Sequence, residues 1–303
     1  MGGNSELCTA YIEPVFNMGC RLESKYENRP GFPRVLYINI HNICNAKCEK
    51  CLSGRYKKPE AFMDMELYRR IIDEFASKGG EVVCMCPHSE PFAHLKALEY
   101  IRYASLKGLK LYFQTNMRGL NDEILQTMVN FGLDAKFKIS FPGIFEETYR
   151  KNTDNCLWES LENTKNLKKK YGDICYIHAL ENNFLPFEKE VVEFYWNFNG
   201  IPVICEHPHN WAGQGEAGGK KMLRVGSGCI DLLNGITVNV SGSVLLCPMD
   251  INETGKLGDL NTSSISEIWN SSKLQSITED VYRGSRVEFD ILCDACHKVS
   301  VKV

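Results

Sequence analysis

Short apolar runs alternate along the chain with longer segments whose apolar residues recur every three or four positions. The short runs are typical of buried strands, and the spacing of three or four is typical of amphipathic helices. Six strands are expected, at 35–40, 81–86, 109–114, 134–140, 173–179 and 201–205. Helices are expected between them, at 64–78, 95–107, 121–131, about 145–170 with a break near 152–155, and 187–198. This alternation predicts an α/β fold with a parallel sheet, which right-handed crossovers allow to curl into a partial (β/α)6 barrel.

The pattern changes after about residue 207. A glycine-rich connection at 211–219 precedes two alternating runs, 236–240 and 243–246, around Ser241-Gly242, which predicts a β-hairpin. Ser264 and Glu267 form a capping-box pattern that opens a short helix. The expected organisation is therefore an N-terminal extension at 1–34, the partial barrel at 35–206, a linker at 207–228 and a small C-terminal hairpin-plus-helix domain at 229–303.

The composition is that of an ordinary soluble globular protein, with 44% hydrophobic and 24% charged residues among 303. A net charge of -3, with basic residues spread along the chain, gives no reason to expect nucleic acid as a partner. No apolar run is long enough to span a bilayer, and the N-terminus has neither a basic leader nor an apolar core. We therefore expect a cytoplasmic protein that does not act at a membrane.

Fourteen cysteines in a chain without an export signal favour metal binding or redox chemistry over a disulfide framework. Seven of them form two spaced groups: Cys44, Cys48 and Cys51, then Cys229, Cys247, Cys293 and Cys296. The first group has C-x3-C-x2-C spacing and directly follows the first strand, where loops of such barrels carry the chemistry. Three thiolates can hold a four-iron cluster and leave one iron without a protein ligand. A structural zinc site, completed at the first group by His41 or His88, is the alternative at both groups.

The two groups together resemble the radical S-adenosylmethionine (SAM) enzymes. The C-x3-C-x2-C loop stands in the position of that family's cluster loop, and Cys229, Gly242, Cys247 and Cys293-Asp294-Ala295-Cys296 are similar to the Twitch domain, a shortened SPASM domain. The resemblance implies two 4Fe-4S clusters, one ligated by SAM and one auxiliary. It also implies reductive cleavage of SAM to a 5′-deoxyadenosyl radical that removes a hydrogen atom from a substrate.

The resemblance also implies cofactor contacts. The loop Pro87 to Pro91 stands where the family has a Gly-Gly-Glu-Pro type sequence, so Glu90 is expected to accept a hydrogen bond from the SAM ammonium, with Ser89 close by. Thr115 and Asn116 after the third strand, and Ser140 at the end of the fourth, are expected to face the same cofactor. An exposed loop acid at Glu90, and ordinary loop capping by Asn116 and Ser140, are the alternatives.

Three further positions bear on the site. Lys50 stands where the family has an aromatic residue beside the adenine, which weakens that contact and leaves the cysteine spacing intact. His207 and His209 follow the sixth strand, so they are candidates for a substrate contact or a general base. The alternative for these histidines is a surface loop.

The resemblance predicts a radical SAM oxidoreductase. Because four cysteines close the auxiliary site, that cluster is expected to accept an electron, which favours dehydrogenation of a small polar molecule such as a sugar or aminocyclitol. The alternatives are a peptide maturase making epimers or cross-links, and a sugar epimerase with Cys84, Cys86 or Cys205 as hydrogen donor. A further alternative is a non-catalytic zinc-binding or redox-sensing protein. An external one-electron reductant such as flavodoxin or ferredoxin is the expected partner.

Overall fold

The computed structural model describes most of the chain, in two compact units. The described residues are 20, 22–23, 25–49, 51–53, 59–181, 183–206, 211–215, 229–283, 292–293 and 296. The first unit comprises residues 1–38, 63–83 and 209–303, and the second comprises 39–62 and 84–208. Lys50, His207 and His209 lie outside the described residues.

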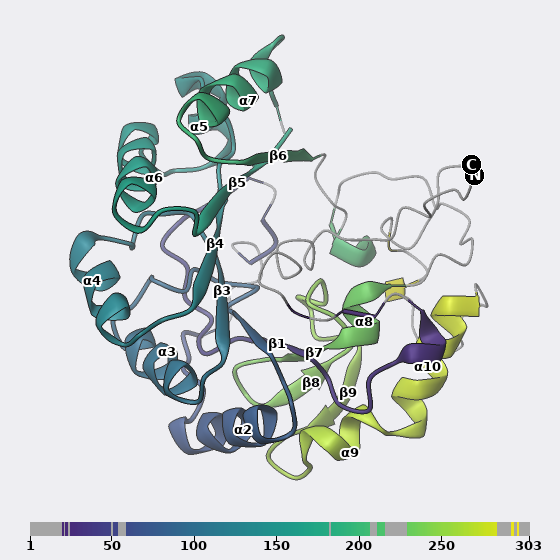
Figure 1. The fold of residues 1–303 in the computed structure, drawn as a ribbon. Coiled ribbons are helices and arrows are strands. Elements are labelled where there is room, and N and C mark those ends of the chain that lie inside the picture. Colours follow the sequence, from purple (N-terminus) through teal and green to yellow (C-terminus); the bar gives the residue numbers. More distant parts are fainter. Residues whose placement is uncertain are drawn as a thin grey trace. The chain divides into compact units, whose positions relative to one another are not determined.

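The second unit is built on parallel strands in the order β6-β5-β4-β3-β2, with β2 shared between the units. The strands are β2 (Val82–Met85), β3 (Lys110–Thr115), β4 (Ala135–Ser140), β5 (Cys175–Leu180) and β6 (Val203–Glu206). The helices between them are α3 (Ala97–Leu106), α4 (Asp122–Asn130), α5 (Glu146–Asn152), α6 (Leu157–Tyr171) and α7 (Glu188–Phe198). Helices α3, α4 and α6 lie along one side of strands β3 to β5 (Figure 1).

The two faces of strands β3 to β6 differ in chemistry. One face is apolar and includes the stacked rings of Phe113 and Phe137, whose centroids are 5.2 Å apart, with Phe92 5.2 Å from Phe113. The register and the two-residue alternation of strand side chains place the polar residues on the other face. They include Tyr112, Gln114, Lys136, Lys138, Ser140, Tyr176, His178 and Glu206, and the apolar Leu180 and Ile204 share this face.

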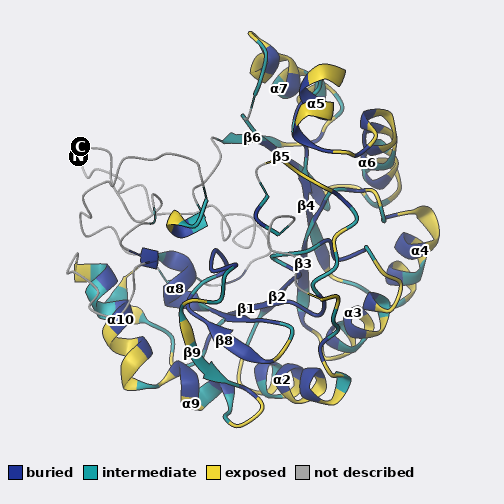
Figure 2. Ribbon diagram, turned by 180° about the vertical axis from the view of Figure 1, so that it is seen from behind, coloured by how far each residue is buried: buried dark blue, intermediate teal, exposed yellow. Residues whose placement is uncertain are grey.

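The strands of the first unit lie in the order β2-β1-β7-β8-β9; β1 and β7 pair in parallel, whereas β7 with β8 and β8 with β9 pair antiparallel. Its further strands are β1 (Val35–Ile38), β7 (Gly235–Val238), β8 (Ser243–Leu245) and β9 (Lys256–Asp259). Its helices are α2 (Met65–Ser77), α8 (Ile230–Asn234), α9 (Ile265–Trp269) and α10 (Ser272–Arg283), with 3-10 turns η1 (Tyr26–Asn28) and η2 (Trp211–Gly213). Figure 2 shows that β1, β8 and α8 are buried, whereas α10 has an exposed face.

Helix α9 is held at its N-terminus from two directions. Ser264 caps the helix and forms the predicted capping box with Glu267. Glu74 of α2 accepts hydrogen bonds from the backbone N–H groups of Ile265 at 2.9 Å and Ser266 at 3.1 Å. Although burial acts to raise the pKa of Glu74, these hydrogen bonds lower it overall. The carboxylate therefore stays charged, where it satisfies the free N–H groups of the helix end.

Most predicted elements are confirmed, with shifted ends. The break in the fourth predicted helix is real, because α5 ends at Asn152 and Thr153 has extended backbone. The hairpin around Ser241-Gly242 is also confirmed. The sequence did not reveal that its first strand, β7, also pairs in parallel with β1, from Val35 opposite Gly235 onward. Among the described residues, no helix is both long and apolar enough to cross a membrane.

Candidate functional site

The C-x3-C-x2-C loop lies in the second unit and is pinned to the loop after α5. The backbone N–H of Glu49 donates to the carbonyl of Asn152 at 3.0 Å, and that of Lys47 donates to Oδ1 of Asp154 at 2.7 Å. The thiol of Cys48 lies 3.6 Å from the hydroxyl of Thr153. These bonds fix a loop that would otherwise have few backbone partners.

The thiols of Cys44 and Cys48 are protonated in the metal-free protein. Cys44 and Cys48 reach the surface, yet surrounding protein atoms desolvate their sulfurs and raise the pKa of Cys44 to about 12 and that of Cys48 to about 11. The nearby Glu90 carboxylate and the neighbouring thiols act in the same direction. Because metal ligation needs thiolates, binding of a cationic cluster here must release protons.

Glu90 joins three loops, through its buried carboxylate and its backbone N–H. Its side chain accepts hydrogen bonds from the Thr115 hydroxyl at 2.7 Å, the Asn116 backbone N–H at 2.8 Å and the Phe92 backbone N–H at 3.3 Å. Its own backbone N–H donates to the carbonyl of Ile43, next to Cys44, at 3.2 Å. Glu90 is 3% exposed, so it is not an exposed loop acid. Burial raises its pKa to about 7, although these hydrogen bonds oppose the shift.

The segment after β3 also contacts the cysteine loop. The Asn116 side chain donates to Oδ1 of Asn45 at 3.0 Å, and Arg118 donates to the carbonyl of Asn45 at 2.6 Å. The Thr115 hydroxyl bonds Glu90 and accepts the backbone N–H of Met117 at 3.0 Å. The structure thus brings Glu90, Thr115 and Asn116 together beside the loop that carries Cys44.

His88 and Ser89 adopt a backbone that does not require glycine. The left-handed conformation in this turn falls on Cys86, with φ of 55°, and neither His88 nor Ser89 has a positive φ. His88 donates its backbone N–H to Oδ1 of Asn39 at 3.2 Å, and the Ser89 hydroxyl donates to the carbonyl of His41 at 2.9 Å. Asn39 was not singled out from the sequence, and His41 was named only as a possible fourth zinc ligand, although two polar residues among strand-like apolar neighbours were a usable signal.

Ser140 stands apart from the Glu90 cluster. It is the last residue of β4 and is half-buried, with the Gln114 side-chain amide 3.5 Å from its hydroxyl. Its in-register neighbour on β5 is His178. It therefore shares the polar face of the sheet rather than the loops that Glu90 connects.

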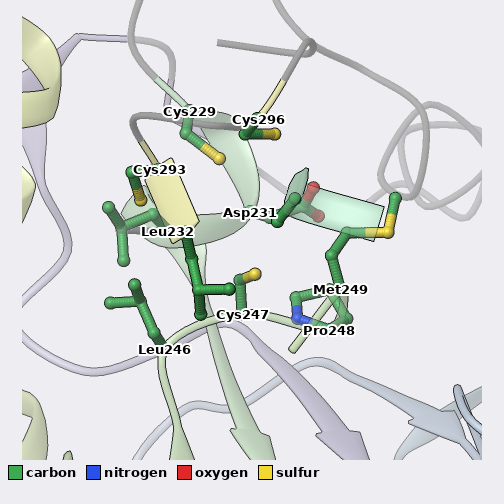
Figure 3. Close-up of a pocket in the computed structure, with 11 residues that line it drawn as sticks. Cys229, Asp231, Leu232, Leu246, Cys247, Pro248, Met249, Cys293 and Cys296 are labelled. Atoms are coloured by element: carbon green, nitrogen blue, oxygen red, sulfur yellow. The ribbon is translucent and has the colours of Figure 1, made fainter. Parts of the chain in front are cut away.

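The second cysteine group lines one pocket within the first unit (Figure 3). Cys229 precedes α8, Cys247 follows β8, and Cys293 and Cys296 come from the C-terminal segment. The other lining residues are mainly apolar: Ala212, Leu232, Leu246, Pro248, Met249, Leu292 and the single acid Asp231. Burial, followed by the neighbouring Cys293 and Cys296, raises the pKa of Cys247 well above its ordinary value.

The backbone around this pocket is fixed by a buried carboxylate. Asp250 accepts hydrogen bonds from the backbone N–H groups of Thr254 at 3.0 Å and Gly255 at 2.8 Å, and from the Gln214 side chain at 3.0 Å. This closes the turn that begins at Cys247. Among the described residues, no three His, Cys, Asp or Glu side chains lie within reach of one single metal ion. Four thiols with apolar walls nevertheless form a donor set that fits an iron–sulfur cluster.

The remaining cysteines named as hydrogen donors lie elsewhere. Cys84 and Cys86 are buried in the core, and the Cys86 sulfur lies 3.9 Å from Nε2 of His41. Desolvation raises the pKa of Cys205 to about 11, and Glu193 of α7 is the next largest influence. Cys205 thus faces the helix layer and not the polar face of the sheet.

Two family models match regions of the chain that contain the two cysteine groups. Residues 38–182 match the Radical SAM superfamily model, and residues 229–297 match the iron-sulfur cluster-binding SPASM model. The SAM-dependent 2-deoxy-scyllo-inosamine dehydrogenase of Niallia circulans is 22% identical over 88% of this chain and 94% of its own length. The tungsten-containing aldehyde ferredoxin oxidoreductase cofactor-modifying protein of Pyrococcus furiosus is 30% identical, over only 34% of this chain and 30% of its own length.

Solved structures show the same fold. BtrN in complex with AdoMet and 2-DOIA matches with a TM-score of 0.62 and 19% identity, over 89% of this chain and 95% of BtrN. Streptococcus suis SuiB bound to precursor peptide SuiA matches with a TM-score of 0.68 and 14% identity, over 95% of this chain and 74% of SuiB. The predicted fold class, a partial barrel with a six-stranded parallel sheet and a C-terminal antiparallel region, is confirmed.

Proposed function

The chain belongs to the radical SAM superfamily and carries a C-terminal SPASM-type domain, and from this premise we propose that it dehydrogenates a small polar molecule such as a sugar or aminocyclitol. The observation that carries the proposal is the pocket of Cys229, Cys247, Cys293 and Cys296. With four protein thiolates, a cluster there has no iron open to a substrate, so its role is to accept an electron.

The first cluster site is assigned to Cys44, Cys48 and Cys51. A three-thiolate 4Fe-4S cluster with bound SAM supplies a 5′-deoxyadenosyl radical that removes one hydrogen atom from the substrate. The pinning of this loop to Asn152 and Asp154 holds the three sulfurs in place. An external one-electron donor of the flavodoxin or ferredoxin type would supply the low-potential electron that cleavage of SAM requires.

Glu90 is assigned to the SAM ammonium. Its Oε2 accepts one protein hydrogen bond, from Asn116, and a carboxylate oxygen has a second lone pair for an ammonium donor. An approaching cation favours the charged form of a buried carboxyl whose pKa is about 7. Binding of the ammonium therefore stabilises the ionised form, and Thr115 and Asn116 keep the carboxylate oriented toward it.

The remaining cofactor contacts are assigned by position. Ser89, adjacent to Glu90, and Asn116 lie on loops that contact the cysteine loop, so they border the same cofactor. Ser140 is assigned to the cofactor carboxylate or ribose from the end of β4. His207 and His209 remain proposed substrate contacts.

The choice of a small polar substrate has two supports. The Niallia relative spans nearly the whole chain, and its name gives it an aminocyclitol substrate. The polar face of strands β3 to β6 offers hydroxyl, amide and charged groups that match a polyhydroxylated molecule. Dehydrogenation also uses the auxiliary cluster, because oxidising an alcohol to a ketone removes two electrons.

Peptide modification is the second candidate. SuiB matches with the higher TM-score and is described with a bound precursor peptide. An epimerase that uses a cysteine donor is less favoured, because Cys205 faces α7 and Cys84 and Cys86 are buried in the core.

The decisive experiment is anaerobic reconstitution with iron and sulfide, followed by dithionite, SAM and a panel of aminocyclitols, sugars and peptides. The proposal expects about eight irons per chain, 5′-deoxyadenosine, and a product two hydrogens lighter than an aminocyclitol or sugar. Zinc at both cysteine sites, or a modified peptide with no small-molecule product, would overturn it.

A further inference from the structure

A buried histidine and a glutamate form a pair on the polar face of the sheet. Nε2 of His178, on β5, lies 3.1 Å from Oε2 of Glu206, the last residue of β6. His178 is 5% exposed, whereas the Glu206 side chain is 31% exposed. A carboxylate held by a buried imidazole and itself about one-third exposed has the geometry of an acid–base group.

The strand register places this pair next to Ser140. His178 lies opposite Ser140 of β4, and Glu206 lies opposite Leu180 of β5. Because side chains alternate with a period of two, Ser140, His178 and Glu206 point to the same face. His178 and Glu206 are diagonal neighbours across β5 and β6, which lie within reach of long side chains. Ser140, proposed to face SAM, is therefore adjacent to the pair.

The neighbouring residue confirms which way Glu206 points. Cys205 faces the helix layer, where Glu193 of α7 influences its pKa. Glu206, one residue later on the same strand, must then point to the opposite, polar face. It also lies at the carboxyl end of a parallel strand, where ligands of such folds bind.

The same face holds groups that suit a polyhydroxylated ligand. Oε1 of Gln114 is buried without a hydrogen-bond partner among the described residues. A buried acceptor without a partner is unfavourable, and a ligand hydroxyl would satisfy it. The hydroxyls of Tyr112 and Tyr176 lie 2.6 Å apart on this face. These groups place hydrogen-bonding capacity beside the histidine–glutamate pair.

We propose that Glu206, held by His178, accepts the hydroxyl proton of the substrate alcohol, an assignment that rests on the proposed dehydrogenase function. The carbon-bound hydrogen leaves as an atom to the SAM-derived radical, and the O–H proton passes to a carboxylate oxygen of Glu206. The remaining electron passes to the auxiliary iron–sulfur cluster. The alcohol carbon becomes a carbonyl, and two electrons and two protons have left the substrate.

The separate roles of Glu206 and His178 follow from the number of hydrogen bonds that a carboxylate can accept. A carboxylate offers about four acceptor positions, and the bond to His178 uses one of them. Nε2–H of His178 orients the group and stabilises its negative charge until the proton arrives. Glu206 is thus the proton acceptor and His178 the positioning residue.

The test uses the reconstituted full-length protein with SAM, dithionite and 2-deoxy-scyllo-inosamine. Glu206→Gln is expected to lower the rate of ketone formation about 100-fold, with 5′-deoxyadenosine formation within about threefold of the unsubstituted enzyme. His178→Gln is expected to lower the ketone rate about tenfold, and Glu206→Asp to recover part of the loss. Calorimetry on the cofactor-free protein should give Glu206→Gln a Kd for this aminocyclitol within about threefold of the unsubstituted value.

A matched control is available at the neighbouring strand end. Glu181 follows β5 and pairs with Lys189 at 2.6 Å on the helix side, so Glu181→Gln should leave the ratio of ketone to 5′-deoxyadenosine unchanged. An unchanged ratio in Glu206→Gln, or a lower ratio accompanied by a Kd weakened to the same extent, would overturn the role of Glu206 as proton acceptor. An unsubstituted enzyme that forms 5′-deoxyadenosine but no ketone would instead overturn the dehydrogenase function itself.

Discussion

The hydroxyl of Tyr37 donates a 2.5 Å hydrogen bond to Oδ1 of Asp231, and both side chains are buried. Tyr37 lies on β1, whereas Asp231 lies on α8 and lines the pocket of the second cysteine group. The bond therefore ties a central strand of the first unit to the wall of the proposed auxiliary site. It also gives the buried Asp231 carboxylate, beside the pocket, a hydrogen-bond donor in place of water.

Replacing Tyr37 with Phe should destabilise the first unit. The phenol is lost and the Asp231 carboxylate loses a buried donor, which lowers the free energy of unfolding by about 1–3 kcal/mol. Urea denaturation of the reduced, metal-free protein measures the change. Tyr37→Phe combined with Asp231→Asn should destabilise by less than the sum of the two single changes; full additivity would show that the two groups do not interact.

Glu90 should make stability depend on pH in a characteristic direction. Its folded pKa of about 7 is above its ordinary value of 4.5, so between these values the folded state binds more protons than the unfolded state. Its contribution is therefore most favourable below about pH 4.5 and is lost as pH rises through 7. The shift of 7 − 4.5, about 2.5 pKa units, corresponds to about 3 kcal/mol.

Glu90→Gln removes this titration and provides the measurement. The free energy of unfolding of Glu90→Gln, relative to the unsubstituted protein, should rise by up to about 3 kcal/mol between pH 5 and 8 in the metal-free state. A constant offset comes from the altered hydrogen bonds with Thr115 and Asn116, so only the slope is diagnostic. Glu60→Gln, at an exposed position, serves as the control. A difference that does not vary with pH would show that Glu90 is ionised throughout.

Phe113 should be a stability determinant of the second unit. It is fully buried and packs between Phe92 and Phe137, so Phe113→Ala should lower the free energy of unfolding by about 3–5 kcal/mol. Phe194 of α7 is 73% exposed, and Phe194→Ala should change the free energy of unfolding by less than about 0.5 kcal/mol. Chemical denaturation of the two variants compares them directly. Equal losses would mean that the apolar face of β3 and β4 does not form the core described.

The parts predictable from the sequence are those that depend on short-range pattern. The capping box at Ser264 and the break near 152–155 each follow from local residue chemistry, and the structure contains both. The two cysteine groups could be found by spacing alone, because thiolate ligands must come in sets.

The long-range partners could not be read in this way. Pairing of β1 with β7 joins residues about 200 positions apart, and the sequence of neither strand identifies the other as its partner. The role of Glu90 as a junction needed the positions of Thr115 and Asn116, and the His178–Glu206 pair needed the register of β5 and β6. A histidine inside an apolar strand carries little signal until the opposite strand is known.

Cys247 separates radical formation from substrate oxidation. It lines the four-cysteine pocket, where burial and the neighbouring thiols raise its pKa, whereas Cys44, Cys48 and Cys51 form the other site. Cys247→Ala should lower the iron content of the reconstituted protein from about eight to about four per chain. With no cluster to accept the second electron, ketone formation from 2-deoxy-scyllo-inosamine should fall at least about tenfold, whereas 5′-deoxyadenosine should still form.

Cys156→Ala is the matched control for Cys247→Ala. Cys156 is exposed, belongs to neither cysteine group and makes no capping hydrogen bond at the start of α6, so its loss should change neither iron content nor products. Iron and zinc are measured by elemental analysis, and both products by mass spectrometry. Ketone formation that persists in Cys247→Ala at half the iron content would show that the electron leaves the substrate by another route. If the unsubstituted protein contains zinc and Cys247→Ala does not, the pocket is a structural zinc site, because a closed four-thiolate zinc site has no redox chemistry.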